Sequence, residues 1–330
     1  MISLIIPYYN SKENIIKCLI GLENQTFYPD EILLIDDGST DKSNILINDF
    51  LSNSRIGKFA KILSLKQNKG PGIARDYGVS KSKNNKIFFL DSDVVLEKNA
   101  LKNFSKSIEH YDAVVGLYND ETFNKGILQS TKCLYYYSIF KSNKIKPYDI
   151  FDAALAGIRK DVYLNSGGYN KKFDKNIDFE NEELGSRIIE NYKQVLDPSI
   201  MGGHIWPKTS RLITTLIIRT SYYIEFLFVK KKSQKAVFKI EEGFKLLLNN
   251  MILLNLVLIL INLKFFYLSI ILFLINFIIF KKFYKIVKDK KLSFFKYFFS
   301  LIIMHFFILI GITYGFLKEI SNRNKIKEIF

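Results

Sequence analysis

The stretch ILLIDDGSTD, residues 32–41, indicates how this chain folds. Four aliphatic residues in a row fit a strand that is buried on both faces, as in a parallel sheet covered by helices. The acidic and turn-forming residues that follow mark the end of that strand. The stretch IFFLDSD, residues 87–93, repeats the pattern of an apolar run that ends in carboxylates. Together the two stretches predict an α/β domain with a polar edge.

Outward from these stretches, the first 120 residues alternate apolar runs with helix-like segments. This alternation predicts a Rossmann-like, mostly parallel sheet with helices on both faces. The expected strands are 2–6, 31–35, 61–65, 86–90 and 112–117, and the expected helices are 12–25, 40–53, 72–82 and 98–110. Farther along, a strand is expected at 153–158 and a helix at 180–192. Ligands of such sheets bind beyond the carboxyl ends of the strands, so the residues that follow each strand form the candidate site.

Polar clusters follow three of these strands and should meet at one edge of the sheet. They are Pro7-Tyr8-Tyr9-Asn10, Asp36-Asp37-Gly38-Ser39 and Asp91-Ser92-Asp93. Carboxylates at i and i+2 suit Mn²⁺ or Mg²⁺ and a diphosphate whose charge such an ion neutralises. A carboxylate after the second strand can hydrogen-bond a ribose hydroxyl or a base edge. Exposed turns, with Ser39 capping the next helix, are the alternative.

A fourth segment, Gly70 to Gly78, opens a helix and contains Arg75. Glycine lets the backbone approach a ligand, and a helix N-terminus attracts anions. The planar guanidinium of Arg75 suits a diphosphate. A packing turn with a surface arginine would produce the same pattern.

In this order, the four segments resemble the family 2 glycosyltransferases, which have the GT-A fold. The resemblance covers about residues 1–206, and it implies that Asp37 contacts the base or ribose of a nucleotide-sugar donor. The implied donor-binding residues are Pro7, Tyr9, Asp36, Asp37, Gly70, Arg75, Asp91, Ser92 and Asp93. Asp93 is the implied metal ligand, with Asp91 beside it and His204 completing the site, although a structural histidine would also fit. Gly157 and Trp206 are the implied acceptor-binding residues.

One position departs from the family pattern. The family's acceptor-side helix usually begins with Glu-Asp, and its aspartate removes the acceptor proton. Here Asn181 occupies that place, and an amide is not a general base at neutral pH. Glu180, Glu182 and Asp178 are therefore the candidate bases.

The C-terminal part differs in composition. Residues 207–330 carry 21 Lys and Arg against 6 Asp and Glu, and they are also the most apolar part of the chain. Basic residues that flank apolar runs suit an anionic membrane surface, whereas nucleic-acid binding would need the basic excess on a soluble face. We expect interfacial amphipathic helices and a basic linker at 207–245, then a membrane domain at 246–330. Its expected spans are 246–262, 265–280 and 298–317.

Two alternatives remain for this part. A buried soluble helical core could account for 246–317, and a re-entrant or interfacial 298–317 would keep the C-terminus in the cytosol. Seven lysines in 281–296 are expected to face the cytosol. Because no signal-peptide pattern precedes the first strand, we expect a cytosolic catalytic domain on a multi-pass protein of the inner (plasma) membrane.

The expected function is inverting transfer of a sugar from a nucleotide-sugar donor to a saccharide or lipid-linked glycan. Inversion follows from the resemblance. A polyprenyl-phosphate sugar transferase is an alternative, because a phosphate acceptor is already ionised and needs no strong base. A non-catalytic nucleotide-sugar-binding membrane subunit is another, again because of Asn181. The donor sugar, the acceptor and the oligomeric state stay open.

Overall fold

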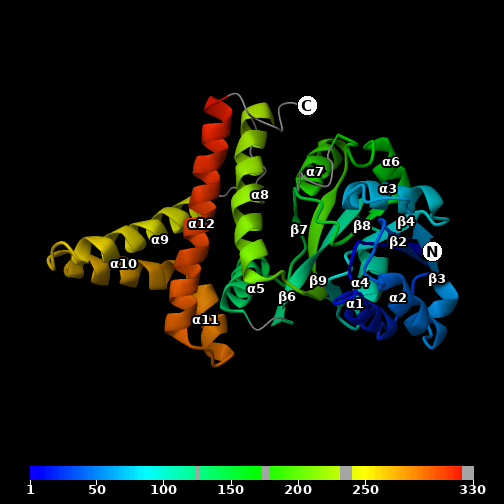
Figure 1. The fold of residues 1–330 in the computed structure, drawn as a ribbon, viewed down its shortest axis with the longest axis horizontal. Helices are drawn as coiled ribbons and strands as arrows, with labels where there is room; N and C mark the ends of the chain where they lie inside the picture. Colours follow the sequence, from blue (N-terminus) through cyan, green and yellow to red (C-terminus); the bar gives the residue numbers. More distant parts are fainter. Residues whose placement is uncertain (124–125, 173–178, 231–239, 322–330) are drawn as a thin grey trace. The chain divides into compact units, whose positions relative to one another are not determined.

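The computed structural model describes residues 1–123, 126–172, 179–230 and 240–321 of the chain (Figure 1). The chain divides into two compact units. The first, here called the sheet unit, comprises Met1–Asn119 and Lys141–Ile205. The second, the helical unit, comprises Asp120–Phe140 and Trp206–Phe330.

The sheet unit contains a mixed sheet flanked by helices. Its strands are β1 (Ile2–Tyr8), β2 (Glu31–Asp36), β3 (Ala60–Ser64), β4 (Lys86–Leu90), β5 (Val94–Leu96), β6 (Ala113–Thr122, which ends in the helical unit), β7 (Lys146–Pro147), β8 (Leu155–Arg159) and β9 (Gln194–His204). Its helices are α1 (Ile15–Glu23), α2 (Ser43–Ser52), the short 3₁₀ helix η1 (Gly57–Phe59), α3 (Pro71–Lys81), α4 (Ala100–Ser107), α6 (Lys160–Asn165) and α7 (Glu180–Asn191). The expected α/β class is therefore confirmed.

The sheet has the strand order β3-β2-β1-β4-β8-β6-β9-β5, with β7 beside β9. The pairs β3–β2, β2–β1 and β1–β4 are parallel, and every residue of β1 and β2 is buried. This explains why these strands read as continuous apolar runs. The pairs β4–β8, β6–β8, β5–β9 and β7–β9 are antiparallel. The sequence pattern therefore describes the parallel part of the sheet.

The antiparallel β5–β9 ladder brings together residues that are far apart in the sequence. Val94 pairs with His204, and the backbone N–H of Ile205 donates to the carbonyl oxygen of Asp93 at 2.8 Å. The end of β9 is thereby fixed beside the turn that follows β4.

Gly157 lies in the middle of the sheet, where β8 pairs with β4 on one side and β6 on the other. A Cβ at this position would lie 2.1 Å from Cε2 of Phe104 and 2.8 Å from the carbonyl oxygen of Ile87. Phe104 is itself buried and packs on Phe88, with ring centroids 4.7 Å apart. The absence of a side chain at Gly157 therefore lets α4 pack directly on the sheet.

The helical unit contains α5 (Ile127–Phe140), α8 (Thr209–Lys230), α9 (Ile240–Ile259), α10 (Phe265–Ile279), α11 (Lys281–Asp289) and α12 (Phe294–Ile320). Buried side chains from all six helices form one apolar cluster, which includes Leu134, Leu212, Leu248, Leu272, Phe283 and Leu301. Among the described residues, Glu241–Ile259 and Phe294–Ile320 are long and apolar enough to cross a membrane. The helices α10 and α11 are bent by 77° relative to each other, and together they would make a third such segment if they formed one span.

We expect Gly157→Ala to lower the thermal unfolding temperature, because the added methyl group overpacks the α4–sheet contact at a cost of about 1–3 kcal/mol. Thermal unfolding of the detergent-solubilised protein measures this effect. Gly243→Ala is the matched control, since nothing lies within 4 Å of a Cβ at that helical position. Equal unfolding temperatures for the two variants would contradict the packing role of Gly157.

Candidate active site

The loops that follow β1, β2 and β4 are joined to one another by hydrogen bonds. The N–H of Asn10 donates to Ser39 Oγ at 3.0 Å, and the N–H of Thr40 donates to Asn10 Oδ1 at 2.8 Å. Ser11 Oγ lies 2.9 Å from Ser92 Oγ. Asn10 has a positive φ of 48°, a conformation that asparagine tolerates better than most residues. The structure thus brings together the three polar clusters expected at this edge of the sheet.

The two aspartates at the end of β2, Asp36 in its last position and Asp37 directly after it, are buried and hold backbone groups. Asp36 Oδ1 accepts from the N–H of Ser39 at 2.8 Å. Asp37 accepts from the N–H groups of Lys69 and Gly70, both at 2.8 Å. Gly70 has a φ of 97°, which favours glycine, and it precedes the first turn of α3. Asp37 therefore fixes the glycine turn that opens α3. At the end of β1, Pro7 is buried and Tyr9 is exposed.

Arg75 is only 2% exposed, so it is not a surface arginine. Its Nη2 lies 2.6 Å from Asp91 Oδ1, and its Nη1 lies 3.7 Å from Glu180 Oε1. The guanidinium also lies over the ring of Tyr169, with its Cζ 5.6 Å from the ring centroid. Burial opposes the charge, but Asp91 and Glu180 outweigh burial and hold the pKa of the Arg75 guanidinium well above its usual value.

Asp93 and His204 are brought close by the β5–β9 ladder. Asp93 Oδ1 lies 3.8 Å from His204 Nε2, and the ring of Tyr118 packs edge-on against the imidazole at 5.0 Å. Mg²⁺ lies about 2.0–2.1 Å from its ligands, so two ligands of one ion are about 3–4 Å apart. The carboxylate and imidazole are thus spaced to share a divalent cation. Among the described residues, no three His, Cys, Asp or Glu side chains form a complete metal site.

The first turn of α7 is buried from Glu180 to Glu183. Tyr169 OH donates to Asn181 Oδ1 at 3.0 Å. Glu183 accepts from Arg187 Nε at 2.7 Å and from its Nη2 at 2.6 Å, and Arg187 Nη2 also donates to the carbonyl oxygen of Gly168 at 2.7 Å. Of the candidate bases, Glu180 faces Arg75, Glu182 is buried in the same turn, and Asp178 lies outside the described residues.

Tyr169 is a site residue to which the sequence assigned no role. It contacts both Arg75 and Asn181, and its N–H donates to Asp76 Oδ1 at 3.2 Å. Burial raises the pKa of the Asp76 carboxyl, to which Tyr163 OH also donates. The two glycines before Tyr169 have positive φ angles, and they are the sequence signal that the chain turns sharply here.

The two expected acceptor residues lie in different surroundings. Gly157 is buried in the sheet unit, as described above. Trp206 belongs to the helical unit, where Lys132 Nζ lies 4.5 Å from its ring centroid. Acceptor binding by either residue stays a prediction.

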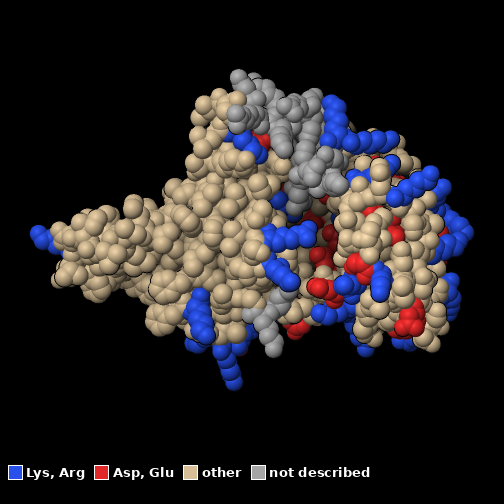
Figure 2. Space-filling model, viewed as in Figure 1, with Lys and Arg blue, Asp and Glu red and all other residues tan. Residues whose placement is uncertain are grey.

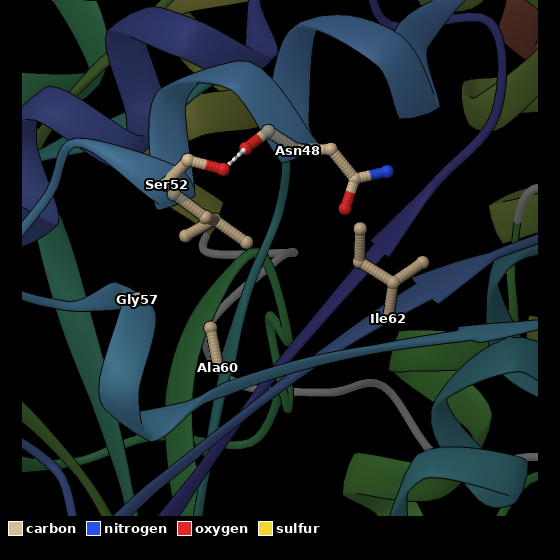
Figure 3. Close-up of a pocket in the computed structure, with 6 residues that line it drawn as sticks. Asn48, Ser52, Gly57, Ala60 and Ile62 are labelled. Carbon is tan, nitrogen blue, oxygen red and sulfur yellow. Dashed lines mark hydrogen bonds between the residues drawn. The ribbon is translucent and has the colours of Figure 1, made fainter.

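A separate hollow of about 450 Å³ lies between the C-terminal half of α2 and β3 (Figure 3). It is lined by Asn48, Leu51, Ser52, Gly57, Ala60 and Ile62. None of these side chains is ionisable. Ala60 begins β3, so the hollow lies toward the amino ends of the parallel strands, away from the polar clusters.

Comparisons with known proteins agree with this geometry. Residues 3–165 match the model of glycosyl transferase family 2. Glycosyltransferase GlyA of Streptococcus pneumoniae is 31% identical over 149 residues, which are 45% of this chain and 20% of the relative. A poly(ribitol-phosphate) beta-glucosyltransferase of Bacillus spizizenii is 35% identical over 113 residues, 32% of this chain and 17% of the relative. The chain thus spans well under half the length of these two relatives.

Among solved structures, the mannosyltransferase PcManGT of Pyrobaculum calidifontis, in complex with GDP-Man and Mn²⁺, superposes with a TM-score of 0.60. The match covers 98% of this chain and 87% of that chain at 14% identity, so it shows the fold alone. Together with the family match, it confirms the resemblance seen in the sequence. The sheet unit is therefore a family 2 glycosyltransferase domain with the GT-A fold, and the chain continues from it into helices that are apolar enough to cross a membrane.

Proposed function

We propose that this chain transfers a sugar, with inversion, from a nucleotide-sugar donor to a saccharide or lipid-linked glycan. The transfer takes place at the cytosolic face of the membrane and serves the synthesis of a cell-surface polysaccharide or glycoconjugate. The observation that carries the proposal is the 3.8 Å separation of Asp93 and His204 beside the Asp91–Arg75 pair. The names of the two relatives, a glycosyltransferase and a polymer glucosyltransferase, support the same class of reaction.

Donor binding is assigned to the edge of the sheet where the three loops meet. Asp36 and Asp37 shape the loop that receives the base and ribose, because their carboxylates hold its backbone. Arg75 holds Asp91, and Asp93 with His204 would hold Mn²⁺ or Mg²⁺. The ion, when bound, neutralises charge on the leaving nucleoside diphosphate.

In the reaction, an acceptor hydroxyl oxygen bonds to the anomeric carbon as the bond from that carbon to the diphosphate oxygen breaks. The hydroxyl proton passes to a carboxylate of α7. Glu180 already faces the Arg75 guanidinium and is better suited to positioning. We therefore assign the general base to Glu182, which is buried one residue after Asn181.

Asn181 favours a second candidate function. At the family's base position stands an amide whose Oδ1 accepts from Tyr169 and whose Nδ2 can only donate hydrogen bonds. Amide hydrogens suit an acceptor that is already anionic. The alternative is therefore transfer to a polyprenyl phosphate, in which the phosphate oxygen attacks without a general base.

The activity itself is tested by incubating the purified protein in detergent with a panel of nucleotide sugars and Mn²⁺ or Mg²⁺. Release of nucleoside diphosphate, with transfer to a glycan or to a polyprenyl phosphate, identifies donor and acceptor class. Donor binding without turnover in the presence of both acceptor classes would instead indicate a non-catalytic subunit.

We expect Asp93→Ala to abolish turnover and to weaken Mn²⁺ binding in the presence of nucleoside diphosphate, because it removes an anionic ligand. Turnover and calorimetric Mn²⁺ titration measure the two effects. Asp49→Ala, on the exposed face of α2, is the control and should behave as the unsubstituted protein. Full activity of Asp93→Ala, or full activity in EDTA, would refute the metal assignment.

We expect Glu182→Gln to lower turnover by about 10²–10⁴-fold with donor affinity unchanged, since general-base help has this magnitude. Steady-state kinetics and donor titration separate the two quantities. Glu190→Gln, an exposed position near the end of the same helix, serves as the control. If Glu182→Gln and Glu180→Gln both keep normal turnover, no carboxylate of this turn is the base.

Asn181→Asp separates the two acceptor classes. With a hydroxyl acceptor, the new carboxylate adds a base at the family's usual position beside Glu182, and we expect turnover to rise. With a phosphate acceptor, the same carboxylate repels the substrate, so turnover falls and the KM for acceptor increases. Kinetics of the variant with each acceptor distinguishes the mechanisms, and a fall would contradict the hydroxyl mechanism.

A further inference from the structure

Within the helical unit, α8 and α12 lie side by side and run in the same direction (Figure 1). A Cβ on Gly311 of α12 would lie only 2.5 Å from the carbonyl oxygen of Ile217 in α8, and Gly315 makes a similar contact one turn farther along α8. Beyond them, Lys318 Nζ lies 2.7 Å from Oε1 of Glu225, which is fully buried. From Gly311 to Lys318 along α12, the contacting residues of α8 run from Ile217 to Glu225. Small residues and a buried ion pair therefore lock α8 and α12 into one element, so the two helices share one orientation in a membrane.

The composition of α8 argues against a membrane crossing. Arg219 lies in the middle of this helix and is half-buried, and the helix ends at Lys230. A charged side chain at the centre of a bilayer is costly. Among the described helices, α8 is not one of those apolar enough to cross. If α8 stays at the surface, α12 stays there with it.

The middle of α12 contacts the α9–α10 hairpin at the midpoint of α9, beside the end of α10. His305 is buried near the midpoint of α12, and its Nδ1 lies 2.5 Å from Asn249 Nδ2 in the first half of α9. Asn276, near the end of α10, donates to Asn249 Oδ1 at 2.5 Å. The turn of the hairpin at Lys264 is about 20 Å from this point, given 1.5 Å per residue. Because the apolar core of a bilayer is about 30 Å thick, a hairpin whose turn reaches the far surface leaves His305 about 10 Å from the other surface, within the depth at which interfacial helices lie.

The distribution of charge identifies which part meets lipid. The outer faces of α9 and α10 are apolar, and Figure 2 shows an almost unbroken uncharged surface over them that ends in basic atoms at the turn. Exposed side chains on this surface include Leu247, Met251, Leu254, Ile271, Leu274 and Ile278. Of the 21 Lys and Arg residues in 207–330, Lys264 alone lies between the two helices. Seven lysines in 281–296 belong to α11, the turn after it and the start of α12, which follow the open end of α10.

We propose that α9 and α10 cross the bilayer as a two-helix hairpin, while α8, α11 and α12 lie together on its lysine-rich surface and contact anionic lipid headgroups. By the positive-inside rule this surface is the cytosolic one, because the seven lysines of 281–296 then lie on it. The start of α8 and the end of α12 share that side. This arrangement differs from the three-span expectation, which puts Lys318 and three further basic residues outside.

Single cysteines test the arrangement in the full chain. The native Cys18 and Cys133 are buried, so the unsubstituted protein sets the labelling background. Ser210→Cys, Leu263→Cys and Ser321→Cys place thiols at exposed positions in the first turn of α8, in the hairpin turn and directly after α12. A membrane-impermeant maleimide is applied to intact cells and to inverted membrane vesicles, and labelling in denaturing detergent shows that each thiol reacts.

We expect Ser210→Cys and Ser321→Cys to label only in inverted vesicles and Leu263→Cys only in intact cells. Labelling of Ser321→Cys in intact cells would overturn the proposal in favour of a crossing α12. Labelling of Leu263→Cys from the same side as Ser210→Cys would overturn it as well, because the hairpin would not cross. Each outcome is independent of sugar transfer, so the test stands apart from the proposed function.

Discussion

The buried guanidinium of Arg75 is the interaction on which the active site depends. From within α3 it contacts Asp91 after β4 and faces Glu180 at the start of α7, so one side chain joins the donor edge of the sheet to the acceptor-side helix. Burial of a charge is costly, so removal of one partner leaves the other charges uncompensated. For a fully buried ion pair this destabilises the protein by about 3–5 kcal/mol, and the effect is smaller here because Asp91 is partly exposed. The two halves of the site therefore cannot shift independently.

The sequence alone was sufficient to predict the parallel part of the sheet and the polar residues at its edge. Strands such as β2 and β4 are buried on both faces, so each reads as an uninterrupted apolar run that ends where a polar cluster begins. The carboxyl ends of parallel strands lie on the same side of a sheet, so the sequence predicts that Asp36, Asp37 and Asp91 lie near one another. Local composition and topology are enough for this part because each strand carries its own signal.

The antiparallel part was not predictable in the same way. β5 has only three residues, and β9 contains Pro198, Gly202 and Gly203, so neither shows a clear strand pattern. Their pairing joins segments about a hundred residues apart, and no local signal specifies that register. The proximity of His204 to Asp93 therefore came from the family resemblance alone, and the link from Tyr169 to Asn181 came only from the structure.

The parallel course of α8 and α12 has an electrostatic consequence. Each helix carries about half a negative charge at its C-terminus, and in a parallel pair the two like poles lie at the same end. Lys318 stands in the last turn of α12, and it contacts Glu225 and the rings of Tyr222 and Tyr314. This lysine thus places a positive charge in the last turn of α12, where the negative pole of that helix would otherwise add to the charge of Glu225. Its ammonium group therefore balances the Glu225 carboxylate near the end where the negative poles of both helices lie.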